Sequence, residues 1–292
     1  MTLTSFERLS TPRLRGVTWV VALATALAGC STLEDFNPFA GERYKMEVEP
    51  VVPASQVYDQ GLAKLANGDP TEAAKKFTDL GKKYPDSDWA RKGLLMTTYA
   101  QYQAADYDGA TGSAQRYVKQ YPHSAEAPYA LYLQANSHYA QIMDISRDQD
   151  HAAKALELFK QLVQTYPTSE YVADAKLKIQ VTTDQLGGKE MSIGRFYLHR
   201  RNYTAAINRF RTVLTSYQTT RHSEEALYRL VECYMGLGIT DEAETAAAIL
   251  GHNFPDGQWY KDAFNLLKSG GRSPQEHPDS WIAKLYHSIV PT

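Results

Sequence analysis

The chain has 292 residues, of which 43% are hydrophobic and 22% charged, and its formal net charge is −2. This balance excludes the strongly basic surface that nucleic-acid binding requires. The length is enough for one large domain or two small ones.

The first 29 residues have the composition of an export signal. Arg8, Arg13 and Arg15 give a basic start, and an uncharged apolar core runs from Val17 to Ala28. As a helix this core would reach about 18 Å, which is too short to cross about 30 Å of hydrocarbon. We therefore predict that residues 1–29 are a signal peptide and no part of the mature protein.

Leu27-Ala28-Gly29-Cys30 resembles the lipobox of bacterial lipoproteins. The resemblance implies that diacylglycerol is joined to Cys30, that the signal is cut just before it, and that the new amine is acylated. Two or more acyl chains give stable anchoring. Ser31 follows Cys30. In Gram-negative lipoproteins an Asp at this position usually marks retention in the inner membrane, so the resemblance implies the inner leaflet of the outer membrane, with the protein facing the periplasm. The alternative is a buried or redox cysteine that happens to follow an apolar run.

Residues 30–54 form a polar, acidic strip without hydrophobic periodicity. Pro38, Pro50 and Pro53 interrupt it. A flexible chain of this length spans about 25–30 Å. We predict a tether between the lipid and the folded part of the chain.

A Tyr-Pro-x-Ser motif recurs along the next two hundred residues. It occurs at Tyr84, Tyr121 and Tyr166, and in weaker form at Tyr217 and Phe254. Offsets of four, seven and eleven residues before these aromatics share one helical face. The residues at these offsets are almost all small or apolar, and they predict one amphipathic helix repeated five times: Ala73, Phe77 and Leu80; Ala110, Ala114 and Tyr117; Ala155, Phe159 and Leu162; Ala206, Phe210 and Val213; Ala243, Ala247 and Leu250.

A second apolar-periodic stretch precedes each copy, so the predicted unit is a helical hairpin. Asp69 before Pro70, with Glu72 following, indicates an N-cap, a proline at the first helical position and a capping box. Each Tyr-Pro pair predicts a helix end, because proline lacks the amide donor and restricts the residue before it.

Small residues followed by a closing proline resemble the tetratricopeptide repeat. Gly61 and Gly194 lie where that repeat takes a small residue in its first helix. The resemblance implies an all-α fold, a right-handed solenoid of about five helical hairpins over residues 55–269, with a concave binding face.

The spacing between successive motifs is longer than the standard repeat. The intervals are 37, 45, 51 and 37 residues, against about 34. We expect insertions in the two longest, at Asp144–Asp150 and at Gly187–Lys189.

Residues 270–292 form a polar tail with a short amphipathic helix. Its apolar face carries Trp281, Ile282, Leu285, Tyr286 and Ile289. Two accounts remain open for this helix: it packs back on the last repeat, or it docks another protein. Cys233, in an apolar stretch, is interpreted as a small buried hydrophobe.

The sequence contains no constellation typical of catalysis. Nucleophile, zinc-protease and phosphate-loop motifs and paired metal-binding cysteines are absent. Asp144, Asp148 and Asp150 lack the glycine and the closing glutamate of a calcium loop, and His199 is interpreted as a surface or capping group. We expect no enzymatic activity, no cofactor and no metal.

Taken together, the lipobox, the Pro-rich tether and about five long repeats with Tyr-Pro-x-Ser closures resemble the BamD family of lipoproteins. Members of this family belong to the machinery that folds β-barrels into the outer membrane. The resemblance implies a non-catalytic scaffold that docks BamA, joins the other lipoproteins of the complex and receives unfolded barrel precursors. The alternative is a periplasmic repeat protein that coordinates cell-wall or Tol-associated partners.

The resemblance also implies sites. The Asp144–Asp150 segment is similar to a polar Asp/Arg-rich loop of the family, and in the Asn208-Arg209 pair the arginine is the expected contact to BamA. Tyr197 and Arg200 are expected to join it, with the C-terminal repeats on the BamA side. Tyr58 and Tyr99 are candidates for a substrate groove in the N-terminal repeats.

Overall fold

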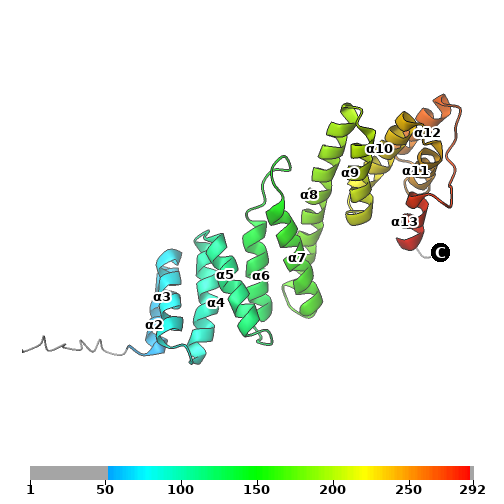
Figure 1. Ribbon diagram of the computed structural model, residues 1–292. Helices are drawn as coiled ribbons and strands as arrows, with labels where there is room; N and C mark the ends of the chain where they lie inside the picture. The colour runs from blue at the N-terminus through cyan, green and yellow to red at the C-terminus, as the bar shows by residue number, and fades with distance from the viewer. Residues whose placement is uncertain (1–51, 290–292) are drawn as a thin grey trace, which may run out of the picture. The chain divides into compact units, whose positions relative to one another are not determined.

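The computed structural model describes residues 52–289, and over this range every regular element is a helix (Figure 1). Helices α2 to α11 pair into five hairpins that stack in chain order, and α12 and α13 complete the C-terminal end. The signal peptide, Cys30 and nearly all of the tether lie outside the described residues. The helix bounds are α2 Ala54–Ala66, α3 Pro70–Lys83, α4 Asp88–Gln103, α5 Tyr107–Gln120, α6 Ala127–Tyr139, α7 Asp150–Thr165, α8 Val172–His199, α9 Tyr203–Ser216, α10 His222–Leu237, α11 Thr240–Asn253, α12 Gln258–Ser269 and α13 Trp281–Ile289.

The five copies of the predicted stripe form the core of the second helices, α3, α5, α7, α9 and α11. All fifteen of these side chains are at most 1% exposed. The first helix of a hairpin approaches this core closely where it carries glycine. A Cβ at Gly61 would lie 2.5 Å from the ring of Phe77, and one at Gly194 would lie 2.4 Å from the ring of Phe210. The amphipathic pattern and both glycine positions are therefore confirmed.

The predicted helix ends are also confirmed. Each second helix stops at the residue before the leading aromatic of the motif. The N–H of Tyr217 donates to the carbonyl of Val213 at 2.9 Å, so α9 closes like the others although its motif has no proline. At the first copy, the Asp69 carboxylate caps α3 by accepting the N–H of Glu72 at 3.1 Å.

One of the two expected insertions is a loop and the other is not. Residues 140–149 form a loop between α6 and α7, as expected. The other expected insertion, Gly187–Lys189, lies inside α8, which runs unbroken for 28 residues, so the added length of the fourth repeat is helix and not loop. The two glycines suit this position because a Cβ on Gly187 or Gly188 would lie 3.2–3.3 Å from side chains at the start of α10 and the end of α9.

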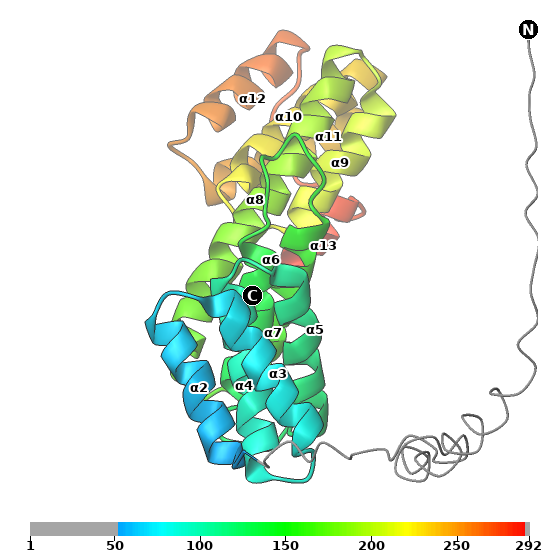
Figure 2. The same cartoon turned by 90° about the vertical axis from the view of Figure 1, so that its left-hand side faces the viewer.

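Helix α8 joins the two halves of the repeat array. It packs against α7 and α9, and it reaches α10. In the turned view the hairpins follow one another from α2 to α13 (Figure 2). The largest core cluster combines side chains of α8 to α13, whereas the earlier hairpins hold smaller, separate clusters.

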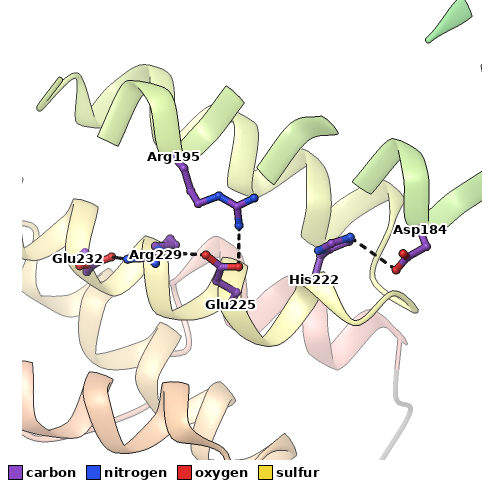
Figure 3. A network of polar contacts seen from close by, with 6 residues as sticks. All are labelled: Asp184, Arg195, His222, Glu225, Arg229 and Glu232. Atoms are coloured by element: carbon purple, nitrogen blue, oxygen red, sulfur yellow. Dashed lines mark hydrogen bonds and ion pairs between the residues drawn. The ribbon is translucent and has the colours of Figure 1, made fainter. Parts of the chain in front are cut away.

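Ion pairs reinforce the contact between α8 and α10 (Figure 3). The carboxylate of Glu225 accepts from Arg195 of α8 at 2.8 Å and from Arg229 of its own helix at 3.1 Å. His222 lies 3.6 Å from Asp184 of α8. These contacts fix the fourth hairpin against the fifth.

The tail helix α13 packs back on the last hairpin. Ile282 is fully buried in the C-terminal core. The indole N–H of Trp281 donates to the Tyr234 hydroxyl at 2.7 Å, and the Arg211 guanidinium lies 4.7 Å from the Trp281 ring centroid. Of the two accounts of this helix, the structure favours the packing one.

Candidate functional surfaces

Five tyrosines from three successive hairpins lie together. We call them the tyrosine cluster: Tyr99, Tyr102, Tyr129, Tyr132 and Tyr171. The rings of Tyr132 and Tyr171 stack with centroids 4.8 Å apart, and Tyr129 lies 5.2 Å from Tyr171. Burial, and then the charge of Tyr99 and other neighbours, raises the pKa of Tyr129 to about 12. All five side chains are partly exposed, and they come from α4, α6 and the residue that precedes α8.

A polar network beneath the tyrosine cluster fixes one of its hydroxyls. The Tyr132 hydroxyl donates to Asp174 at 2.6 Å, and the Lys178 ammonium lies 2.9 Å from the same carboxylate. Burial opposes the charge of Lys178, but hydrogen bonds to Asp174 and Tyr132 outweigh it and raise the lysine pKa. Lys178 is therefore engaged by its neighbours Asp174, Tyr132 and Asn136.

The two groove residues expected from the sequence lie in different places. Tyr99 belongs to the tyrosine cluster. Tyr58 instead packs between Phe77 and Trp89, with centroid distances of 5.4 and 5.2 Å. Sequence reasoning missed Tyr129, Tyr132 and Tyr171. A usable signal was the pair of tyrosines three residues apart in the first helix of two successive hairpins.

A second exposed surface lies at the turn between α8 and α9, and we call it the Phe196 patch: Phe196, Tyr197 and Arg200. The Phe196 ring is 49% exposed, meets Tyr197 edge-on at 5.5 Å, and carries the Arg200 guanidinium 4.2 Å above it. Tyr197 also packs against the C-terminal core, so this core supports the patch.

The neighbouring turn also exposes apolar side chains. Leu237 and Ile239, between α10 and α11, are 42% and 45% exposed. A Cβ at Gly236 would lie 2.6 Å from the ring of Tyr203, at the start of α9, so the two turns are side by side.

The expected arginine contact, Arg209, already has a partner within the chain. Its guanidinium donates to Glu190 of α8 at 3.1 Å, and its side chain is 43% exposed. Asn208 beside it is exposed. Arg209 borders the core stripe next to the buried Phe210, as its position on the helix predicts.

Cys233 and His199 lie as the sequence indicates. Cys233 is fully buried, and burial raises the pKa of its thiol to about 12, so this thiol is unreactive at neutral pH. His199 is exposed at the last position of α8.

Three ligand-type side chains also meet where the tail crosses α11: Asp241, Glu244 and His277. The buried Glu244 carboxylate lies 2.9 Å from His277 and 3.5 Å from Arg272. These pairings account for the cluster as a structural link between the tail and α11.

None of the helices between residues 52 and 289 has the length and hydrophobicity that a membrane crossing requires. The YfiO family, described as outer membrane lipoprotein, matches residues 50–249.

Named relatives cover nearly the whole chain. The outer membrane protein assembly factor BamD of Caulobacter vibrioides is 41% identical over 259 residues, which are 88% of this chain and 82% of that protein. BamD of Rickettsia prowazekii is 36% identical over 250 residues, covering 86% and 95%. Among solved structures, a thermophilic tetratricopeptide-repeat protein of Thermus thermophilus aligns with a TM-score of 0.35 at 17% identity, covering 72% of this chain and 98% of that one. From the family match and the identity to these two relatives, we conclude that the chain belongs to the BamD family of outer membrane protein assembly factors.

Proposed function

We propose that this chain is a non-catalytic scaffold of the β-barrel assembly machinery. It receives unfolded outer-membrane proteins on its N-terminal repeats and docks BamA with its C-terminal repeats. The assembly role rests on family membership, because the relatives are named assembly factors. The tyrosine cluster is the observation that carries the receiving role.

The tyrosine cluster suits an extended segment of an unfolded barrel. Barrel strands alternate apolar and polar side chains, so one edge of such a segment presents a row of apolar or aromatic groups. Tyrosine offers a large apolar ring with a hydroxyl at its tip. Since the pKa of Tyr129 is about 12, its hydroxyl stays protonated at neutral pH and can donate to a peptide carbonyl. Tyr58, near Trp89, extends the aromatic character toward the first hairpin.

The Phe196 patch and Arg209 suit a docking surface for BamA. An exposed aromatic ring stacked by arginine, on a rigid helix end, is typical of residues that dominate binding energy in interfaces. Arg209 can grip a carboxylate of the partner with its planar fork. We assign Arg209, Asn208, Tyr197 and Arg200 to this contact, and the other lipoproteins of the complex to surfaces outside it.

The anchor is Cys30, acylated and held in the outer membrane with the solenoid in the periplasm. Mass spectrometry of the mature N-terminus should find a diacylglycerol-modified, N-acylated Cys30, and Cys30→Ala should leave the signal uncut by the lipoprotein peptidase. An unmodified Cys30 in the wild-type protein contradicts the anchor.

Site-specific photo-crosslinking tests the receiving role. A photoreactive residue at position 99 or 129 should trap the C-terminal segment of an unfolded barrel protein, and one at Lys119, exposed on the second helix α5, should not. Equal or stronger crosslinking at position 119 overturns the assignment.

Purification after mild solubilisation tests the docking role: BamA should accompany the protein, and recovery of cell-wall hydrolases without BamA supports the alternative scaffold.

A further inference from the structure

Two histidines face each other at the base of the loop 140–149. His138 lies in the last turn of α6 and His151 in the first turn of α7. Their Nδ1 atoms are 3.2 Å apart and their ring centroids 5.4 Å apart. Both side chains are partly buried.

Two imidazole nitrogens that both present a lone pair repel one another at this distance. Either one Nδ1 carries a hydrogen and donates it to the other, or a metal ion lies between two lone pairs. Zinc takes imidazole nitrogen at about 2.0–2.1 Å in tetrahedral geometry. That geometry separates two ligand nitrogens by about 3.3 Å, which matches the observed distance.

The charged groups around the two histidines help to decide between a hydrogen bond and a metal ion. Burial, followed by His151 and Lys154, lowers the pKa of His138, whereas Asp108 of α5 opposes that shift. Lys154 disfavours a cation, and Asp108 offsets it. Asp108 is exposed in the first turn of α5, and its charge acts on His138. Its carboxylate would have to change rotamer to become a third ligand.

We propose that His138 and His151, with Asp108, bind a divalent transition metal of the zinc class. Imidazole and carboxylate are suitable ligands for such an ion, and water can complete the coordination. The ion would join α5, α6 and α7 and fix both ends of the loop 140–149. The proposal concerns a site apart from the tyrosine cluster and the Phe196 patch.

Calorimetric titration with ZnCl2 of the tag-free mature lipoprotein in detergent tests the site. We expect saturable one-to-one binding in the micromolar range, and a rise in melting temperature with added Zn²⁺. His138→Ala and His151→Ala should each weaken binding by more than about tenfold, and Asp108→Asn by less. His252→Ala is the matched control, because His252 is exposed on α11, and it should bind like wild type.

Cobalt gives an independent readout, since a four-coordinate site produces visible absorption bands that are lost in both histidine variants. Circular dichroism confirms that each variant is folded, and His138→Gln replaces the alanine variant if that one is not. Absence of saturable wild-type binding, or wild-type affinity in both folded histidine variants, overturns the proposal and leaves the hydrogen bond as the explanation.

Discussion

The Lys189 ammonium donates a hydrogen bond to the backbone carbonyl of Ser146 at 3.0 Å, and it reaches the carbonyl of Arg147 at 3.1 Å. Gln185, one turn earlier on α8, donates to the Met143 carbonyl at 3.0 Å. The segments that lengthen the third and fourth repeats are therefore in contact. Extra helix in α8 supplies the donors, and the loop 140–149 supplies the acceptors.

Replacing Lys189 should release this loop without unfolding the protein. In Lys189→Met, faster amide hydrogen exchange should be confined to residues 144–149, because the loop carbonyls lose their fixed donor. The free energy of unfolding should fall by no more than about 1.5 kcal/mol, the usual contribution of one hydrogen bond. Lys176→Met, at an exposed position of the same helix, is the control. Equal exchange in both variants would show that Lys189 does not hold the loop.

Two glycine substitutions should have opposite effects on stability. Gly194→Ala places a Cβ 2.4 Å from the Phe210 ring, and we expect a loss of about 1–3 kcal/mol from overpacking. Gly112→Ala meets nothing within 4 Å in the middle of α5, and better helix propensity should stabilise the protein by about 0.5–1 kcal/mol. Urea unfolding of both variants measures the difference. Similar changes in the two would mean that close approach at Gly194 is not what selects glycine there.

Alkaline pH should destabilise the protein partly through Cys233. Burial raises the pKa of this thiol to about 12, against about 8.5 in an unfolded chain. The unfolded state then loses its proton first, so this contribution to stability is complete below about pH 8.5 and is lost as the pH rises toward about 12. Cys233→Ala should show a shallower fall in the free energy of unfolding between pH 8 and 10. Identical slopes in the two proteins would contradict a raised thiol pKa.

Local pattern and chemistry predicted more of the fold than of the sites. The Ala206–Phe210–Val213 stripe is visible in sequence because burial imposes helical spacing on residue type. The sequence locates the added residues at Gly187–Lys189 but not their conformation, and only the close approach of α10 shows why glycines stand in this part of helix α8. The tyrosine cluster depends on how three hairpins are placed, which no local pattern encodes. The ion pair of Arg209 with Glu190 likewise joins two helices, and a helical position alone could not predict it.

The ion pair between Arg209 and Glu190 has to be considered in the test of the proposed BamA contact. Arg209→Glu should weaken BamA binding by more than about 2 kcal/mol, the range for losing one partner of a desolvated charge pair. The melting temperature should stay near wild type, because partly exposed ion pairs contribute little to stability. The variant, however, places a second carboxylate beside Glu190, so repulsion within the chain must be separated from loss of the partner contact.

Exchanging the charges of Arg209 and Glu190 separates repulsion within the chain from loss of the contact with BamA. In the double variant Arg209→Glu with Glu190→Lys, opposite charges again face each other between α9 and α8, so any lost stability should return. Binding to BamA should stay weak, because position 209 still presents a negative charge to the partner. Changing an acidic residue of BamA to arginine should then recover binding to the Arg209→Glu variant. If the double variant binds BamA like wild type, Arg209 acts only through its pair with Glu190, and the contact with BamA lies elsewhere on the C-terminal repeats.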